Sequence, residues 1–221
     1  PIARALLAAH GVPVASGVVL ERGDESLGAL APPWIVKPAR EDASHGIDLD
    51  SVVSDEAAAR RRARELIARY RQPALIESFL EGRELSLSFV GSTQAPTPLP
   101  IFEVDFTLFP AGRPKLVTYA AKWHKHSDEA RGTPLIPARS LAPALARQVL
   151  ETACAAWRAL ELRGYGRVDL RVADDGRMIV LEVNPNPDLA PDAALALAAA
   201  HAGIDSPLLI EWLVDQALGK R

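Results

Sequence analysis

The fold is decided by a stretch that reads Arg167-Val168-Asp169-Leu170-Arg171-Val172, then Ala173-Asp174-Asp175-Gly176, then Arg177-Met178-Ile179-Val180-Leu181-Glu182-Val183-Asn184-Pro185. Two runs rich in Val, Leu and Ile flank a turn that contains Asp-Asp-Gly, a pattern that predicts an antiparallel hairpin. With residues 174–177 as the loop, Asp169 lies opposite Glu182. Side chains alternate between the two faces of a strand. One face is therefore predicted to be apolar, with Val168, Leu170, Val172, Ile179, Leu181 and Val183. The other is polar, with Arg167, Asp169, Arg171, Glu182 and Asn184.

Two carboxylates that face each other on a sheet repel, so this hairpin needs a compensating positive charge. Asp169, Glu182 and Asn184 offer oxygen ligands of the kind that Mg²⁺ takes from proteins. Alternatively, Arg167 and Arg171 neutralise both acids in a surface lattice of ion pairs. The hairpin alone leaves both interpretations open.

Composition narrows the class of protein. The chain has 221 residues, 48% of them hydrophobic and 24% charged, which suits one large or two small domains. A net charge of -3 and a pI near 6.0 give no bias toward nucleic acid or anionic membranes. The sequence has no run of about 18 apolar residues and no signal-peptide pattern. With the single Cys154, which fits a reducing compartment, these features predict a cytoplasmic protein with no membrane partner.

The order of elements predicts an α+β protein with two layers, because strands and helices are mixed and a hairpin lies near the end. The abrupt N-terminus, with no Met, predicts that the chain begins inside an element of a longer protein. An Arg-rich helix over 54–71 is interpreted as a solvated face rather than a nucleic-acid surface, since no aromatic platform accompanies it. Residues 99–106 and 115–122 are predicted strands, and 123–138 a loop that acts as a lid. Ser140 is predicted to cap a helix in which Cys154 belongs to the core.

Common nucleotide and metal motifs are missing. The sequence has neither a P-loop nor a Gly-x-Gly-x-x-Gly fingerprint, no Cys cluster for zinc and no Gly-x-Ser-x-Gly elbow. His124 and His126 lie beside Lys122 and Lys125, a setting that disfavours a bound cation. What remains is a set of charged or polar residues at strand ends and edges, which together suit phosphoryl transfer. They are Lys37, Glu77, Glu84, Lys122, Arg167, Asp169, Glu182 and Asn184.

Several ordered motifs make the chain resemble ATP-grasp ligases, with the closest likeness to the D-alanine–D-alanine ligase branch. They are Ile-Val-Lys-Pro-Ala (35–39), the loop with Gly46, Leu-Ile-Glu-Ser-Phe-Leu-Glu-Gly-Arg-Glu-Leu (75–85), Ala-Lys-Trp (121–123), Arg-Gly-Tyr-Gly-Arg-Val-Asp (163–169) and Leu-Glu-Val-Asn-Pro (181–185). The resemblance covers essentially all 221 residues. It implies two α+β subdomains, residues 1–76 and 77–221, with a nucleotide bound between two largely antiparallel sheets.

The resemblance also implies a role for each site residue. Lys37 would contact adenine and the α-phosphate, and Glu84 the ribose hydroxyls. Ser44, His45 and Gly46 would close over the phosphates, and Lys122 would lie near the γ-phosphate. Glu77, Ser78, Phe79 and Leu80 would form the adenine hinge. Asp169 and Glu182 would bind one Mg²⁺, Glu182 and Asn184 a second, with Mn²⁺ as an alternative ion, and Arg167 would stabilise the transition state.

These roles imply an ATP-dependent carboxylate–amine ligase that acts on small amino acids or amines through an acyl phosphate. The expected partners include no nucleic acid, and the resemblance allows a homodimer. Two alternatives remain: a nucleotide-binding module without ligase turnover, and an ATP-grasp kinase. The family also has an N-terminal domain and an upstream ATP-contacting lysine that this sequence lacks. Residues 186–189 and Ala193 differ from the family's acceptor segment, so D-alanine as acceptor does not follow.

Overall fold

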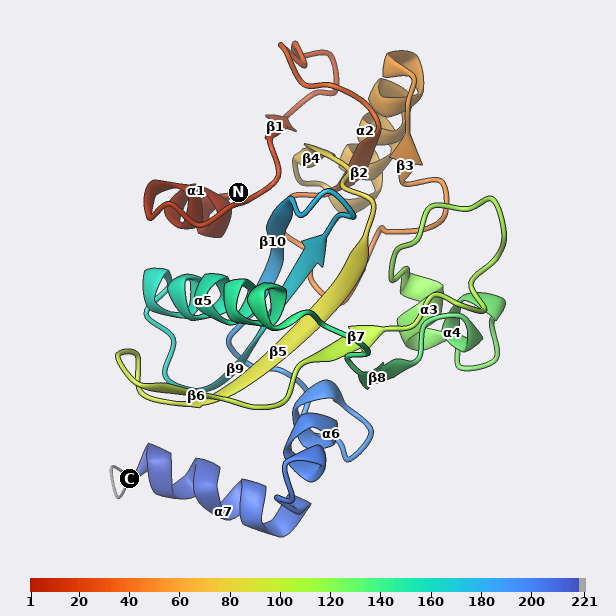
Figure 1. Ribbon diagram of the computed structural model, residues 1–221. Coiled ribbons are helices and arrows are strands. Elements are labelled where there is room, and N and C mark those ends of the chain that lie inside the picture. The colour runs from red at the N-terminus through yellow and green to blue at the C-terminus, as the bar shows by residue number, and fades with distance from the viewer. Residues whose placement is uncertain (219–221) are drawn as a thin grey trace. The chain divides into compact units, whose positions relative to one another are not determined.

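The computed structural model describes residues 1–218, which form two compact units (Figure 1). Unit 1 holds Ala15–Gly82 and Asp105–Pro134. Unit 2 holds Ile2–Val14, Arg83–Val104 and residues 135–218. The predicted subdomains 1–76 and 77–221 stay a prediction. The packing units follow another division, because segments distant in sequence fold together.

Unit 1 contains a four-stranded antiparallel sheet in the order β1-β4-β2-β3. Its strands are β1 (Gly17–Leu20), β2 (Trp34–Pro38), β3 (Val52–Val53) and β4 (Ala74–Ser78). Helix α2 (Glu56–Tyr70) begins after Asp55, whose carboxylate accepts a hydrogen bond of 2.7 Å from the Ala58 N–H. Its small buried residues Ala59 and Ala63 let the helix pack on Val36 and Ile76 of the sheet.

The second segment of unit 1, Asp105–Pro134, differs from the predicted pattern. Residues 115–122 were expected to form a strand, and this prediction was wrong. The Thr118 hydroxyl accepts a hydrogen bond from the Ala121 N–H and starts the short helix α3 (Tyr119–Trp123). Ser127 starts α4 (Asp128–Arg131) in the same way. The expected strand over 99–106 is shortened to β7 (Phe102–Val104), which belongs to unit 2.

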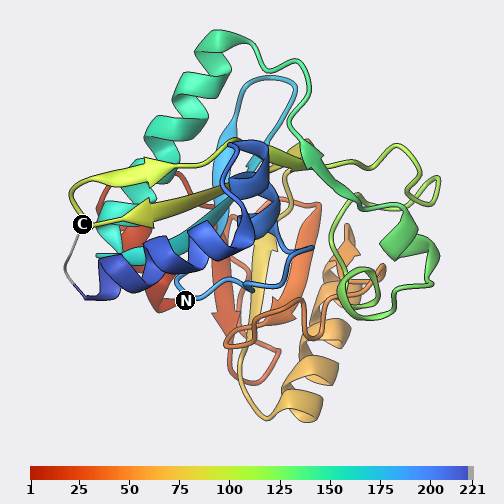
Figure 2. The ribbon, with the colours of Figure 1, turned by 90° about the horizontal axis from the view of Figure 1, so that it is seen from below.

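Unit 2 is built on a six-stranded antiparallel sheet in the order β10-β9-β5-β7-β8, with β6 paired to β5. Alternate side chains of the central strand β5 (Arg83–Gly91) pack in opposite directions. Leu85, Leu87 and Phe89 join the core formed with α5 (Pro143–Ala159) and α1 (Ile2–Ala9), whereas Val90 packs with α6 (Ala194–His201) and α7 (Ser206–Ala217). Figure 2 shows α5 (teal) and the blue helices on either side of these strands. The other strands are β6 (Pro96–Pro98), β7, β8 (Leu135–Pro137), β9 (Gly164–Val172) and β10 (Met178–Asn184).

Helix α5 begins later than the sequence indicated. Ser140 does not cap it, since the helix starts at Pro143 with Ala142 as its N-cap and without a side-chain hydrogen bond. Pro143 favours this start, because a proline in the first helical turn needs no N–H partner. Cys154 is partly buried and packs against the core of unit 2, as predicted, and this burial raises the pKa of its thiol against the opposing charge of Arg158.

Within residues 1–218, no single helix is long and apolar enough to cross a membrane. The bent pair α6 and α7 passes the test on length and composition only.

The turn formed by residues 21–25 of unit 1 is expected to make the free energy of unfolding depend on pH. Desolvation opposes the charge of Glu25, but its carboxylate accepts hydrogen bonds from the N–H groups of Glu21, Arg22 and Gly23, and these lower its pKa from 4.5 to about 2. A carboxylate with a lowered pKa stabilises the fold above its unfolded pKa, and the contribution is lost as pH falls through the folded value. We therefore expect Glu25→Gln to lower the free energy of unfolding most above pH 4.5, and the difference from the unmodified chain to vanish toward pH 2.

The measurement is urea unfolding between pH 2 and 7, with the exposed Glu21→Gln as the matched control. A difference between Glu25→Gln and the unmodified chain that does not change over this range would contradict the prediction.

Candidate functional site

The hairpin of β9 and β10 places the two predicted metal-binding carboxylates opposite each other. Glu182 pairs with Asp169, and Asn184 pairs with Arg167, which confirms the predicted opposition. The turn, however, is one residue shorter than predicted. The Ala173 N–H donates to the Arg177 carbonyl at 2.9 Å, so the loop is residues 174–176, with Gly176 at a φ of 85°. A register shift between Val180 and Glu182 restores the Asp169–Glu182 pair.

This register shift also changes which residues face the core. Val180 pairs with Leu170 and is 4% exposed, whereas Leu181 is 38% exposed. The prediction that Ile179 and Leu181 line the apolar face was therefore wrong. Met178 and Val180 pack in the core instead, and Val183 resumes the apolar face beyond the bulge. A β-bulge adds one residue to one strand, so alternation continues out of phase on its far side.

The polar face of the hairpin continues onto the neighbouring strand β5. Ser88 pairs with Arg167, Ser86 with Asp169 and Glu84 with Arg171. Ser86 and Ser88 are buried, and the side chains of Arg167 and Asp169 are 16% and 14% exposed. Three adjacent strands thus present charged and hydroxyl groups on the sheet face opposite α5.

Arg167 and Asp169 are joined by three hydrogen bonds on this polar face. The guanidinium Nε donates to both carboxylate oxygens, at 2.9 and 3.0 Å, and Nη2 donates to Oδ2 at 2.8 Å. The negative charge of Asp169 raises the pKa of Arg167 despite the opposing desolvation, and Glu182 and Glu84 add to the increase. Arg167 therefore supplies part of the compensating charge of the hairpin through Asp169, and Arg171 pairs through Nη2 with Oε2 of Glu84 on the neighbouring strand.

The polar face carries oxygen atoms of the kind that coordinate Mg²⁺. The Asn184 side-chain oxygen accepts from the Asn186 N–H at 2.9 Å, and Asp169 accepts from Arg167. Asn184 Oδ1 and Asp169 Oδ1 each keep a second lone pair, whereas Asp169 Oδ2 accepts two hydrogen bonds from Arg167. Residues 1–218 contain no group of three or more His, Cys, Asp or Glu side chains placed to hold a metal. Mg²⁺ usually takes only one or two carboxylates and completes its octahedron with water and phosphate. Two carboxylates and one amide fit that pattern, and the metal assignment stays a prediction.

Unit 1 brings together two residues predicted to contact the nucleotide. Lys37 on β2 and Glu77 on β4 form an ion pair in which Nζ and Oε2 are 2.5 Å apart. Backbone hydrogen bonds hold the residues that follow Glu77. The Ser78 N–H donates to the Ser16 carbonyl and the Phe79 N–H to the Pro33 carbonyl. Leu80 comes next, in an irregular segment.

The predicted phosphate loop lies against the segment that carries Lys122. The Ser44 hydroxyl donates to the Val117 carbonyl at 2.8 Å, and the Trp123 indole N–H donates to the Ala43 carbonyl at 3.1 Å. The His45 ring lies 5.0 Å from the Tyr119 ring, centroid to centroid. Unit 1 therefore places the Ser44-His45-Gly46 loop beside α3, which contains Lys122.

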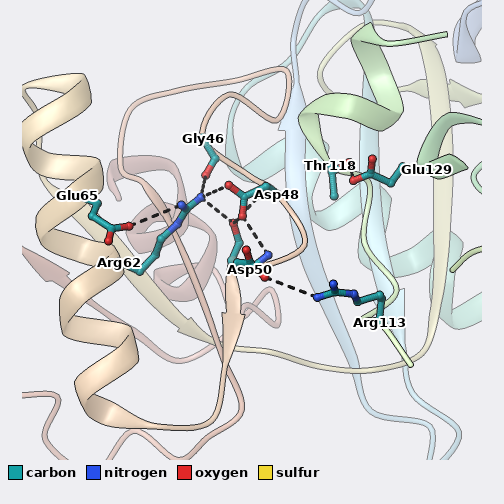
Figure 3. A network of polar contacts seen from close by, with 9 residues as sticks. Gly46, Asp48, Asp50, Arg62, Glu65, Arg113, Thr118 and Glu129 are labelled. Carbon is teal, nitrogen blue, oxygen red and sulfur yellow. Dashed lines mark hydrogen bonds and ion pairs between the residues drawn. The ribbon is translucent and has the colours of Figure 1, made fainter. Parts of the chain in front are cut away.

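Two arginines take a larger part in these networks than the sequence indicated. Arg62 of α2 donates to the Gly46 carbonyl at 3.2 Å and to the Asp48 carboxylate at 2.5 Å (Figure 3). Its side chain is only 18% exposed, so the interpretation of the Arg-rich helix as a solvated face was wrong for this residue. The available signal was its position next to the apolar stripe of Ala59 and Ala63. Arg171 was predicted on the polar face. Its pairing with Glu84 was not predicted, because it depends on the register between β5 and β9.

The two antiparallel sheets match the ATP-grasp fold that the sequence predicts, and solved structures confirm this fold. The structure of a D-alanine–D-alanine ligase from Bacillus anthracis complexed with ATP aligns with this chain at a TM-score of 0.74 and 23% identity. The alignment covers 98% of this chain and 64% of the ligase chain. The VanG D-Ala:D-Ser ligase from Enterococcus faecalis aligns with 97% and 60% of the two chains, with a TM-score of 0.75 and 19% identity.

The chain belongs to the family described as D-ala D-ala ligase C-terminus, which matches residues 6–215. It is 34% identical to D-alanine–D-alanine ligase A of Mesorhizobium japonicum over 99% of the chain and 60% of that protein. It is 32% identical to a D-alanine–D-alanine ligase of Desulfotalea psychrophila over 95% and 62%. It is also 32% identical to the uncharacterized protein y4sG of Sinorhizobium fredii over 98% and 61%. The chain thus spans about three fifths of the length of these relatives.

Gly46 offers a test of the phosphate loop. Its φ is +76°, and a Cβ would meet the Pro38 Cγ at 2.6 Å. We expect Gly46→Ala to lower the free energy of unfolding by more than about 1 kcal/mol, because alanine is strained at positive φ and also clashes here. Gly112→Ala is the matched control, with a φ of +71° and open space around the added carbon. Equal losses for the two variants in chemical unfolding would mean that the contact with Pro38 does not constrain the loop.

Proposed function

We propose that this chain carries the ATP- and metal-binding part of an ATP-dependent carboxylate–amine ligase. The observation that carries the proposal is the pairing of Asp169 with Glu182 and of Arg167 with Asn184 on one polar sheet face. Membership of the D-ala D-ala ligase C-terminus family supports it, as do relatives named D-alanine–D-alanine ligase and the solved complex of one such enzyme with ATP.

The nucleotide contacts in this proposal come largely from unit 1. Lys37 would hold adenine and the α-phosphate, and its ion pair with Glu77 orients the ammonium group. The segment from Glu77 to Leu80 would contact the adenine, with Glu84 of unit 2 on the ribose. The Ser44-His45-Gly46 loop and Lys122 would contact the phosphates, and the hydrogen bonds from Ser44 and Trp123 support their joint assignment.

The metal contacts in this proposal come from the hairpin of unit 2. Asp169 and Glu182 would bind one Mg²⁺ and Glu182 with Asn184 a second, and Mn²⁺ can take the same oxygen ligands. Bound ions would neutralise the charge of the phosphate oxygens. Arg167 keeps its positive charge at all relevant pH, because Asp169 raises its pKa, and it would stabilise the charge that develops on the transferred phosphoryl group.

The reaction has two steps. A substrate carboxylate oxygen attacks the γ-phosphorus of ATP, the bond to the β-phosphate oxygen breaks, and ADP leaves. An amine nitrogen then attacks the acyl carbon, inorganic phosphate leaves, and the nitrogen loses a proton. Fixed positive charge is needed in the first step, because the carboxylate and the γ-phosphate repel each other until that charge offsets them.

The substrates proposed are small amino acids or amines. The acceptor is not assigned to D-alanine, because residues 186–189 and Ala193 differ from the family's acceptor segment. Asn186 is held by the Tyr165 hydroxyl, which donates to its side-chain oxygen at 2.5 Å, so this segment is fixed next to Asn184. A cytoplasmic location and a homodimer belong to the same proposal.

A second candidate is nucleotide binding without ligase turnover. The chain spans about three fifths of the length of the relatives, two of which are named as ligases. Release of ADP separates the two candidates, since turnover with a mixture of amino acids yields ADP and phosphate and binding alone yields neither.

Glu182 provides the test of the metal assignment. We expect the unmodified chain to bind ATP in calorimetric titration with Mg²⁺ and at least tenfold more weakly without it, because a charged ligand network is lost. Glu182→Gln should abolish the difference between the two titrations. The control is Glu151→Gln, which changes an exposed carboxylate on α5 and should keep the Mg²⁺ dependence.

The outcomes separate the parts of the proposal. Mg²⁺-dependent binding that survives Glu182→Gln would refute the metal assignment but keep the nucleotide site. An unmodified chain that binds no ATP under either condition would refute both candidates.

A further inference from the structure

The strand β5 presents one carboxylate to the polar face, and a buried arginine of the neighbouring strand holds it. Glu84 lies directly opposite Arg171 in the β5–β9 register. Arg171 Nη2 donates to Glu84 Oε2, and the two side chains are 4% and 15% exposed. A charge-assisted hydrogen bond at this degree of burial restricts the carboxylate to a narrow range of orientations.

Only one of the two carboxylate oxygens is used in this pair. Oε2 accepts from Arg171, and Oε1 accepts no hydrogen bond from residues 1–218. An ionised carboxylate is an acceptor with about four lone-pair sites. Glu84 can therefore accept hydrogen bonds from two hydroxyl groups through Oε1 without breaking its contact with Arg171.

Glu84 lies opposite Arg171 on β9, and the other arginine of the polar face, Arg167, lies opposite Ser88. Along β9, Arg167, Asp169 and Arg171 occupy every second position, and each arginine has its own carboxylate, Asp169 for Arg167 and Glu84 for Arg171. The charge of Glu84 still raises the pKa of Arg167, so the two lie within electrostatic range. Without Arg171, the Glu84 carboxylate would be drawn toward the remaining cation, because its alternative is a nearly buried and unpaired charge.

We propose that Arg171 is a positioning residue, which fixes Glu84 so that its free oxygen accepts the 2′- and 3′-hydroxyl groups of the ATP ribose. The inference rests on the proposed nucleotide site and goes beyond it, since it assigns sugar discrimination to a residue that does not itself contact the nucleotide. The planar guanidinium suits this role better than lysine, because its N–H groups have fixed directions.

The test compares the affinities of ATP and 2′,3′-dideoxy-ATP in calorimetric titrations of the full chain with Mg²⁺. The unmodified chain should bind ATP about tenfold or more tightly than the dideoxy nucleotide, because hydrogen bonds to a charged acceptor are lost. Arg171→Met should lower the affinity for ATP to that for dideoxy-ATP and leave the latter unchanged. Glu84→Gln, alone or combined with Arg171→Met, should lower the affinity for ATP no further than Arg171→Met alone does.

Arg177→Met is the matched control. Arg177 lies on the same hairpin, is exposed and pairs with Asp175 at the turn, so its loss should leave the ratio of the two affinities unchanged. A merely structural role of Arg171 would weaken both nucleotides alike. Circular dichroism establishes that each variant is folded, and if Arg171→Met does not fold, Arg171→Lys replaces it with an expected severalfold fall in the ratio.

Each outcome bears on one proposal. An unchanged ratio in the folded Arg171 variant overturns the positioning role. Equal affinities of the unmodified chain for both nucleotides overturn the contact of Glu84 with the ribose. Absence of ATP binding by the unmodified chain instead overturns the proposed function itself.

Discussion

Asp169 and Glu182 face each other across β9 and β10, and the repulsion between these two carboxylates shapes the whole polar face of unit 2. Arg167 offsets this repulsion through hydrogen bonds to both Asp169 oxygens. A hairpin that needed only stability would avoid this arrangement, because an apolar or oppositely charged pair costs nothing in repulsion. We propose that these oxygens, beside Asn184, bind a cation, because carboxylate and amide oxygens are ligands that Mg²⁺ takes from proteins.

The register that creates this pair depends on a bulge. The three-residue loop would by itself place Leu181 opposite Asp169 and turn Glu182 toward the core, because a slip of one residue exchanges the two faces of a strand. The irregularity between Val180 and Glu182 returns Glu182 to the polar face and exposes Leu181. Bulges often re-aim side chains next to functional sites. Here the bulge allows Val180 to complete the core and Glu182 to reach Asp169 in the same strand.

Much of the fold could be predicted from local patterns. The helix predicted over 54–71 and the hairpin with its opposed carboxylates have short-range signals, which are a polar residue that can cap the helix and a turn with glycine between two apolar runs. The failures have two causes. Thr118 starts a helix where a strand was expected, through a local hydrogen bond from the Ala121 N–H. Residues 105–134 pack in unit 1 and Arg62 reaches Gly46 through contacts between segments distant in sequence. That Val180 rather than Leu181 faces the core could not be predicted, because it depends on how β10 pairs with β9, and no single segment reveals this pairing.

The central claim is that the polar half of the hairpin binds a divalent cation together with the nucleotide phosphates. The most direct measurement is paramagnetic broadening of backbone amide signals when Mn²⁺ is added in small amounts to the chain saturated with a non-hydrolysable ATP analogue. The account predicts early broadening at Asp169, Glu182 and Asn184, and sharp signals at Gly176, which lies about 20 Å away along the strand. Broadening that begins instead at His124 and His126, or that shows no selectivity along the hairpin, would contradict it.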